Sequence, residues 1–301
     1  MAAVLVLFDP TANPEATLSQ LSTLVGTVVL VDNAEFVHPW CAAQEALPHN
    51  VLQYRNANAG GLAGAYNAAL SFLRLNGISF SQVVFLDEDS DVSVLAAFMR
   101  DQEVMRVLAS PSTAAVAPAF RERETGMRGR GILLERWHVH FLARDAQGLQ
   151  TVTLLINSMS VWRADALKRI GDFNEGLAID LVDTEYCLRA RHAELKVYMH
   201  GSHEFLHTIG HRRIYKFLGR TLQSGGHSPA RRYLIGRNTA WLGRTYVFKE
   251  PAWSLFFCVG RLAHEFIGIA LAEDERGKKL SQLTRGVLAG IFMRRLRLQA
   301  P

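Results

Sequence analysis

The chain has 301 residues, of which 49% are hydrophobic and 20% charged, a composition typical of a globular protein and unlike a disordered one. Its length predicts one large domain or one and a half. The three cysteines lie far apart and form no C-x-x-C pair, which argues against a disulfide framework or a zinc site and suits a reducing cytosol.

The net charge of +5 conceals an asymmetry along the chain. Residues 1–200 hold 16 Lys/Arg and 22 Asp/Glu, whereas residues 201–301 hold 17 Lys/Arg and only 6 Asp/Glu, which gives the second part a net charge of +11. A basic C-terminal third favours contact with phosphate, an anionic membrane or nucleic acid, and a merely solvated basic surface is the alternative.

The N-terminal segments predict a parallel sheet. Apolar strands are expected over 4–8 and 27–33, with a short helix over 14–24 between them, and this alternation is typical of Rossmann-like winding. Asp32 ends the second strand, where a carboxylate can accept a hydrogen bond from a pyrimidine N3–H or a ribose hydroxyl, or serve as a plain turn residue. The apolar start has no basic flank, and no run of about 18 uncharged apolar residues occurs, so neither a signal peptide nor a spanning helix is expected.

A glycine-rich segment follows the third predicted strand, 51–54. Residues 55–67 read RNANAGGLAGAYN, which predicts a tight turn and then an alanine-rich helix whose free N–H groups could face phosphate or sugar. The segment matches neither G-x-G-x-x-G nor a phosphate loop ending in Gly-Lys-Ser/Thr, so a nicotinamide dehydrogenase is disfavoured. Asn58 and Asn67 could both reach a ligand only if the turn folds back.

The most informative stretch is VVFLDEDS, residues 83–90. It predicts a buried strand that ends in a carboxylate cluster, at the edge of the sheet where α/β proteins bind ligands. Asp87 and Asp89 are two residues apart and can turn toward one hard cation, because carboxylate oxygens suit Mg²⁺ and Mn²⁺. A solvated acidic turn is the alternative reading.

The middle of the chain predicts further alternation. An amphipathic helix is expected over 92–108, a strand over 114–118, a mobile loop over 121–131, a strand over 151–156 and a helix over 163–170. Three acids, Asp180, Asp183 and Glu185, then surround the start of another helix. Asp183 can cap that helix, but capping explains only one of the three. A strand over 197–199 precedes His203 and His207.

Taken together these motifs resemble the inverting family 2 glycosyltransferases of GT-A fold, and within them bacterial dTDP-rhamnose-dependent rhamnosyltransferases. The resemblance covers roughly residues 4–245 and rests on these stretches: VDN 31–33, NAGGLAGAYN 58–67, FLDEDS 85–90, IDLVDTEYCLR 179–189, HTIG 207–210 and RYLIGRN 232–238. It implies a Rossmann-like, mixed, mostly parallel sheet flanked by helices. The implied domains are a catalytic domain over 1–245, with a nucleotide-sugar half to about 120 and an acceptor half after it, and a helical basic region over 246–301.

The resemblance also implies roles for individual residues. Asp183 matches the family's catalytic base, and His207 would join Asp87 and Asp89 as a ligand to a Mg or Mn ion. Asp180, Glu185 and Arg189 form a supporting cluster, with Arg189 orienting the acids. The residues expected to bind the nucleotide sugar are Asp32, Asn33, Asn58, Gly61, Asn67, Asp87, Glu88, Arg212 and Arg237, with Arg213 and Arg232 as further candidates to neutralise phosphate.

Metal-assisted single displacement of L-rhamnose from dTDP-rhamnose onto a glycolipid or lipopolysaccharide/O-antigen-type acceptor is the function that the resemblance implies. The alternatives are a UDP-sugar donor, a nucleotidyl- or pyrophosphate-transferring enzyme, and a non-catalytic nucleotide-sugar or nucleic-acid-binding module. Asp9-Pro10-Thr11-Ala12-Asn13 is unlike the phosphate loop that the second alternative needs. The basic residues lack interleaved aromatic residues, so no nucleic-acid partner is expected.

The C-terminal segments 251–272 and 282–297 are apolar but interrupted by charged residues, which predicts amphipathic or packed helices. With a lipid-linked acceptor, the enzyme would work as a cytoplasmic protein attached peripherally to the anionic inner face of the cytoplasmic membrane. Packing on the core and a homo-oligomer interface are the alternatives.

Overall fold

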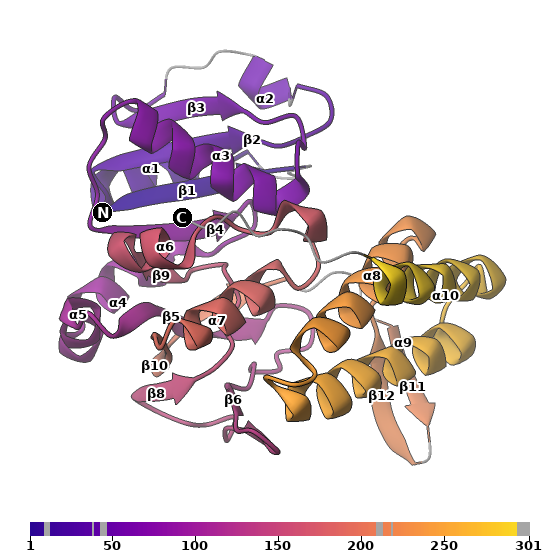
Figure 1. The fold of residues 1–301 in the computed structure, drawn as a ribbon. Helices are drawn as coiled ribbons and strands as arrows, with labels where there is room; N and C mark the ends of the chain where they lie inside the picture. Colours follow the sequence, from indigo (N-terminus) through magenta and orange to yellow (C-terminus); the bar gives the residue numbers. More distant parts are fainter. Residues whose placement is uncertain (9–12, 38, 43–46, 209–212, 218, 294–301) are drawn as a thin grey trace. The chain divides into compact units, whose positions relative to one another are not determined.

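The computed structural model describes residues 1–8, 13–37, 39–42, 47–208, 213–217 and 219–293 (Figure 1). The chain divides into two compact units, which are described separately. Over the described residues, the first unit contains 1–131 and 142–207, and the second contains 132–141 and 208–293. The predicted domain boundary near residue 245 stays a prediction. The two compact units meet in the sequence at residues 207 and 208.

An eight-stranded sheet with the order β3-β2-β1-β4-β9-β5-β10-β8 forms the centre of the first unit. Six strands are mutually parallel, and β8 and β9 run in the opposite direction. The expected mixed, mostly parallel sheet is therefore confirmed. The strands are β1 (Ala2–Leu7), β2 (Thr27–Asp32), β3 (Val51–Arg55), β4 (Gln82–Asp87), β5 (Thr113–Glu122), β8 (Leu149–Val152), β9 (Val161–Arg163) and β10 (Lys196–His207).

Helices cover both faces of this sheet. On one face, Ala3, Leu5 and Leu7 share a buried cluster with side chains of α1, η1, α4 and α5. On the other face, Phe85 of β4 contacts Tyr66 of α3, with ring centroids 4.6 Å apart. Burial of β1 on both sides explains its uninterrupted apolar sequence. The helices are α1 (Glu15–Leu24), α2 (Pro39–Ala42), α3 (Gly61–Leu75), η1 (Val92–Val94), α4 (Leu95–Arg100), α5 (Gln102–Ala109), α6 (Ala164–Ile170), η2 (Glu175–Leu177) and α7 (Val182–His192).

Several predicted elements differ from the observed ones. The helix expected over 92–108 is broken at Asp101, whose carboxylate caps α5. The strand expected over 114–118 extends to Glu122, because β5 pairs with β10 as far as His207. The start of the loop expected over 121–131 is thus strand. Arg128, later in it, is buried and donates to the carbonyl of Arg144 at 2.7 Å.

The second unit holds two hairpins and a set of C-terminal helices. The helix α8 packs on α10 through glycines: a Cβ added at Gly286 would lie 2.1 Å from the carbonyl oxygen of Tyr233. Arg232, predicted as a phosphate contact, is fully buried and forms ion pairs with Glu265 and Glu273. That role for Arg232 was wrong. The elements are β6 (Ile132–Leu134), β7 (Val139–Phe141), β11 (Arg213–Phe217), β12 (Arg220–Ser224), α8 (Pro229–Tyr246), η3 (Trp253–Cys258), α9 (Val259–Ala272) and α10 (Arg276–Phe292).

Among the described helices, one continuous stretch, Trp253–Ala272, is long and apolar enough to cross a membrane by length and composition. Its mean hydropathy is 1.6, and 17% of it is buried. The expectation of no such segment rested on the charges within it, but Glu265 is paired with Arg232 inside the unit. A single helix of this kind is weak evidence for a span.

The close approach of α8 and α10 predicts a specific loss of stability. Gly286→Ala should lower the free energy of unfolding by about 1–3 kcal/mol, because the added methyl group meets backbone and cannot be accommodated by a rotamer change. Gly277→Ala is the matched control: it lies in the same helix with no atom within 4 Å of its added Cβ, and it should be neutral or slightly stabilising. Urea unfolding of the two variants provides the measurement, and equal stabilities would contradict the packing described.

Candidate active site

The parallel strands of the first unit end in polar residues at one edge of the sheet. Because β2, β4, β5 and β10 run the same way, Asp32, Asp87, Glu122 and His207 stand at their carboxyl ends. Open α/β sheets bind ligands at this edge. The edge is therefore the place where the predicted site residues can meet.

The predicted metal ligands come together there. Asp87, Asp89 and His207 each offer one ligand atom, and these atoms lie within 4.8 Å of one another. The turn after β4 brings Asp89 back: the amide of Ser90 donates to the carbonyl of Asp87 at 3.0 Å, and Ser90 Oγ accepts from the amide of Asp87 at 2.8 Å. Ser90 Oγ is also hydrogen-bonded to Ser158 Oγ at 2.8 Å, which ties this turn to the segment after β8.

The electrostatics of this group favour a bound cation. Burial, followed by the charges of Asp89, Asp183 and Glu88, raises the pKa of Asp87 to about 7. Burial lowers the pKa of His207, although Asp89 and Glu122 act in the opposite direction. At neutral pH His207 is thus a neutral imidazole and a competent ligand. Two carboxylates and one imidazole fit a divalent cation such as Mn²⁺ or Mg²⁺, whose charge would offset their repulsion.

Asp183, the predicted base, lies near this group: its charge adds to burial and to the charge of Asp89 in raising the pKa of Asp87. It lies in the first turn of α7 rather than at the N-cap, which is Leu181 in a left-handed conformation (φ 66°). Asp183 Oδ1 accepts from the amide of Thr184 at 2.7 Å. Negative charge is favourable at this end of a helix. Asp180 is half-buried in the turn before α7.

Glu185 and Arg189 form a buried pair one helical turn apart. Arg189 Nε lies 2.9 Å from Glu185 Oε1, and the Glu185 side chain is 1% exposed. Arg189 also donates to the carbonyl oxygens of Ile170 and Asp172 at 3.0 and 2.8 Å. Arg189 thus fixes α7 against the preceding segment, and Glu185 is its partner.

One candidate on the nucleoside side, Asp32, is held by Arg55, a neighbouring arginine that the sequence analysis missed. Asp32 is fully buried, and its Oδ1 lies 3.0 Å from Arg55 Nη1. The two residues are direct partners in the pairing of β2 with β3. Asn33 is also buried, and its Oδ1 accepts from Asn56 Nδ2 at 2.7 Å. The sequence did carry a signal for Arg55: β2 ends in the acid Asp32, and the next strand along the chain, β3, ends in the base Arg55.

The glycine-rich turn has a different role from the one predicted. The amides of Leu62 and Ala63 at the start of α3 donate to the carbonyl of Ala178, at 2.7 and 3.3 Å. The expectation that these N–H groups face phosphate or sugar was wrong. Gly61 permits the contact, because it has φ 65° and an added Cβ would lie 2.6 Å from the same carbonyl oxygen.

Asn67 is likewise used within the protein. Its Oδ1 accepts from the amide of Phe173, and its Nδ2 donates to the carbonyl of Phe173 and to Glu175 Oε1. These contacts join α3 to the segment before α7, so the side chain has a structural task. Asn58 lies in the turn before α3 with φ 58°.

The remaining predicted residues belong to different elements of the chain. Glu88 Oε2 accepts from the amide of Phe8 at 2.8 Å and so ties the end of β1 to the turn after β4. Arg237 lies on α8 in the second unit, where its Nε donates to Asn238 Oδ1 at 3.0 Å. Arg212 lies outside the described residues. Nucleotide-sugar binding by these residues stays a prediction.

An aromatic cluster lies beneath the acidic site. Tyr66 contacts Phe85 and Phe173, with ring centroids 4.6 and 5.1 Å apart, and Phe173 stacks on Tyr186 of α7 at 3.9 Å. Burial and the charges of Asp87 and Asp183 raise the pKa of Tyr66, so its phenol stays protonated beside the two carboxylates. The sequence analysis did not single out Tyr66, whose only signal was its place within the helix after the glycine-rich turn.

Comparison with known proteins gives one informative relative. No family model matches the chain. The chain is 26% identical over 252 residues to the dTDP-rhamnosyl transferase RfbF of Shigella flexneri, and the match covers 80% of this chain and 79% of that protein. This similarity supports a glycosyltransferase. The expected resemblance to rhamnosyltransferases is thereby confirmed.

Two solved structures are similar at a lower level. TarS of S. aureus aligns with a TM-score of 0.45 at 15% identity, covering 96% of this chain and 55% of TarS, so this chain spans just over half of it. A mycobacterial protein aligns with a TM-score of 0.42 at 11% identity, covering 74% of this chain and 82% of that one. Neither likeness is strong enough to support an argument about function.

The raised pKa of Asp87 predicts proton release when a metal ion binds. Because the ion needs the ionised carboxylate and the pKa of Asp87 is raised to about 7, Mn²⁺ binding should release more protons per ion at pH 6 than at pH 8. Isothermal titration calorimetry in two buffers of different ionisation enthalpy measures this number. The variant Asp87→Asn serves as the control and should release none. Release of no protons at pH 6 from the unchanged protein would contradict this account.

Proposed function

We propose that the chain transfers L-rhamnose from dTDP-rhamnose to a hydroxyl of a glycolipid or lipopolysaccharide/O-antigen-type acceptor, with inversion at the anomeric carbon. The observation that carries the proposal is the grouping of Asp87, Asp89 and His207 at the carboxyl edge of the sheet, with Asp183 near enough for its charge to act on Asp87. The relative from Shigella flexneri, which is named as a dTDP-rhamnosyl transferase, supports the choice of donor. A UDP-sugar donor is the closest alternative.

Each group in the cluster has a separate task in this proposal. A divalent ion held by Asp87, Asp89 and His207 would offset the charge of the donor diphosphate. Asp183 accepts the proton of the acceptor hydroxyl while the hydroxyl oxygen forms its bond to the anomeric carbon. The bond from that carbon to the diphosphate oxygen breaks, and its electron pair leaves with the diphosphate. Attack opposite the leaving group inverts the anomeric centre without a covalent enzyme intermediate.

The proposed nucleoside contact is the end of β2. Asp32 presents a buried carboxylate that Arg55 holds in place, and Asn33 is anchored by Asn56. A rigid acceptor group of this kind suits the N3–H of thymine or uracil, so it favours a pyrimidine nucleotide without choosing between the two. The choice of dTDP therefore rests on the relative.

A transfer assay tests the proposed base. Asp183→Asn keeps the size of the side chain and its contact with the amide of Thr184, but it removes the basic group. Turnover with dTDP-rhamnose should fall by at least ~10²-fold, whereas dTDP binding should be retained. The matched control is Asp91→Asn, the same change at a residue that caps η1, and it should keep normal turnover.

The result also separates the competing candidates. Near-normal turnover of Asp183→Asn would move the role of base to Asp180, since Glu185 is committed to Arg189. No turnover of the unchanged protein with any nucleotide sugar, together with intact dTDP binding, would favour a non-catalytic binding module.

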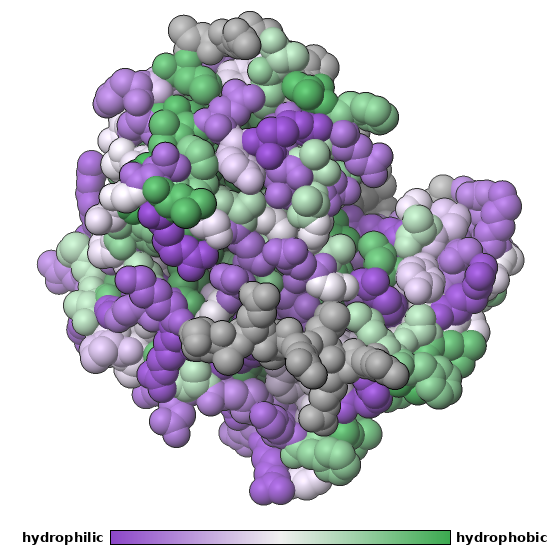
Figure 2. Space-filling view, turned by 45° about the horizontal axis from the view of Figure 1, so that its top comes forward, coloured by the Kyte–Doolittle hydropathy of each residue, from purple (hydrophilic) through white to green (hydrophobic). Residues whose placement is uncertain are grey.

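We further propose that the second unit attaches the enzyme to the anionic inner face of the cytoplasmic membrane. Large apolar side chains of η3 and α9 are exposed: Leu255 by 50%, Phe256 by 66% and Val259 by 58%. Apolar residues also reach the surface over the C-terminal helices in Figure 2. Together with the net charge of +11 on residues 201–301, this surface suits an anionic bilayer.

Vesicle sedimentation tests this attachment. Anionic vesicles should bind the protein at low salt and release it at high salt, because exposed charges are screened over about 8 Å at physiological ionic strength. Leu255→Ser with Phe256→Ser should weaken binding, whereas Leu75→Ser, at an 87% exposed leucine of the first unit, should not. Binding that resists salt and yields only to detergent would indicate an inserted helix. No binding at any salt would leave packing or a homo-oligomer interface as the role of these helices.

A further inference from the structure

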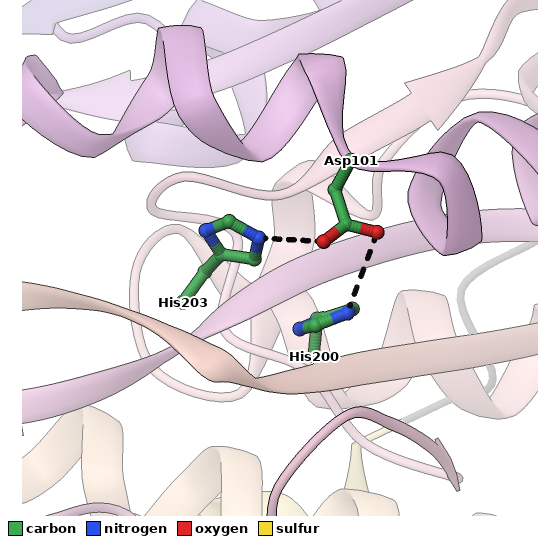
Figure 3. Close-up of side chains that lie close together, drawn as sticks. All are labelled: Asp101, His200 and His203. Atoms are coloured by element: carbon green, nitrogen blue, oxygen red, sulfur yellow. Dashed lines mark hydrogen bonds and ion pairs between the residues drawn. The ribbon is translucent and has the colours of Figure 1, made fainter.

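A second group of metal-ligand side chains lies in the first unit, apart from the candidate active site. Asp101, His200 and His203 each offer a ligand atom within 4.8 Å of the others (Figure 3). Along β10, His203 precedes His207 by four residues, or about 13 Å of extended strand. This group therefore needs its own explanation.

A break between two helices positions Asp101. The residue lies between α4 and α5, and its Oδ1 accepts from the amides of Glu103 and Val104 at 2.8 and 3.4 Å. This capping holds the carboxylate at the N-terminus of α5 and leaves Oδ2 directed at His203, whose Nε2 lies 3.0 Å away. A continuous helix over 92–108, as the sequence predicts, would not present Asp101 in this way.

An irregularity in β10 places both histidines on the side of Asp101. The pairing with β5 shifts between His200 and Glu204, so the residues between them have no partner in that ladder. Residues three apart on a regular strand point to opposite faces, but this bulge lets His200 and His203 converge, with ring centroids 4.8 Å apart. The bulge is held in place by Gly201, whose amide donates to the carbonyl of Gly148 at 2.7 Å.

His200 is the unusual member of the group. Its side chain is 3% exposed, and its Nε2 is buried without a hydrogen-bond partner. This nitrogen lies 3.6 Å from Asp101 Oδ1 and 3.3 Å from Glu103 Oε2, so it is directed at two carboxylates. A buried polar atom that forms no hydrogen bond while facing two negative groups indicates that a cation belongs among them.

We propose that Asp101, His200 and His203, with Glu103 as a fourth donor, bind a transition-metal ion of the Zn²⁺ type. Tetrahedral Zn²⁺ with bonds of about 2.0–2.1 Å places its ligand atoms about 3.3 Å apart. Three nitrogen–oxygen contacts here are near that value: 3.0 Å from His203 Nε2 to Asp101 Oδ2, 3.6 Å from His200 Nε2 to Asp101 Oδ1, and 3.3 Å from His200 Nε2 to Glu103 Oε2. One atom from each of Asp101, His200 and His203 lies within 4.8 Å of the others, so binding needs only a small contraction. Two imidazoles favour Zn²⁺ over Mg²⁺ or Mn²⁺, in contrast to the carboxylate-rich group at Asp87. Asp101 and His203 are 25% and 18% exposed, which gives an ion access.

The site has a structural role. It joins the N-terminus of α5 to the bulge of β10, the strand that ends at His207. A bound ion would act as a cross-link between segments about 100 residues apart in sequence, and binding to the folded chain alone stabilises it by mass action.

The competing explanation is a proton in place of the metal. His200 Nδ1 accepts from the amide of Ser202 at 3.3 Å, a long contact that keeps the proton on Nε2 when no ion is bound. When an ion binds Nε2, the imidazole proton moves to Nδ1. Nδ1 can then no longer accept from the amide of Ser202, so this long contact is lost. A protonated His200 would instead form ion pairs with Asp101 and Glu103 and bind no metal.

Metal titration of the full chain, with any affinity tag removed and metal stripped by chelator, tests the proposal. To exclude the Asp87 group, the titration is done in the Asp89→Asn background, where one equivalent of Zn²⁺ should bind and raise the melting temperature. Co²⁺ should give the visible absorption of a tetrahedral site. Adding His203→Gln, which keeps a donor toward Asp101, should reduce Zn²⁺ affinity by at least tenfold and abolish the Co²⁺ spectrum.

Two controls keep the result decisive. Glu103→Gln, at a half-exposed side chain, should weaken Zn²⁺ binding even if His203→Gln were to fold poorly, which circular dichroism in chelator would reveal. His138→Gln, at a histidine outside both groups, should change nothing. The proposal is overturned if the Asp89→Asn protein binds no Zn²⁺, or if it binds Zn²⁺ equally well with and without His203 and Glu103. A melting temperature that does not change with Zn²⁺ would likewise overturn the proposal and favour the proton.

Discussion

The burial of a carboxylate beside other carboxylates at the end of β4 is the constraint on which the candidate active site depends. Burial, reinforced by the charges of Asp89 and Asp183, raises the pKa of Asp87 to about 7, so that Asp87 holds its proton up to that pH. The folded chain therefore loses stability as the pH rises from about 4 to about 7, since the unfolded chain gives up this proton more readily. The aromatic cluster around Tyr66 and Phe173 lies beneath, and its burial offsets that cost.

Much of the first unit could be predicted from local patterns. The strands that end at Asp32 and Asp87 are continuous apolar runs, which is the signature of parallel strands buried on both faces. The same apolar runs predicted Asp87 at a strand end. The order of the motifs along the chain, compared with the family it resembles, predicted His207 and Asp183 as further site residues. Local patterns fail where a residue's role is set by a distant partner. Asn67 hydrogen-bonds to the backbone of Phe173, and Gly61 packs against the carbonyl of Ala178; each partner is more than 100 residues away.

Other features left little trace in the sequence because they depend on pairing. The three-residue strand β9 exists only because it fits between β4 and β5. The extension of β5 to Glu122 requires β10 as its neighbour. The convergence of His200 and His203 needs the bulge in β10, and the position of the Asp101 carboxylate needs a break in a pattern that otherwise indicates one helix. Cysteine spacing is the usual sequence signal of a zinc site, and it cannot reveal a site whose ligands are imidazoles and carboxylates.

The antiparallel strand β9 has a consequence for the mechanics of the sheet. It is the strand through which β3, β2, β1 and β4 are joined to β5, β10 and β8 in the described sheet, and it pairs with β5 at only two positions. Asp87 and Asp89 belong to the first half and His207 to the second. A ligand that binds Asp87, Asp89 and His207 would therefore connect the two halves of the sheet across the strand that pairs with β5 at only two positions. Occupancy of the site and cohesion of the two halves are then thermodynamically linked, so that each strengthens the other.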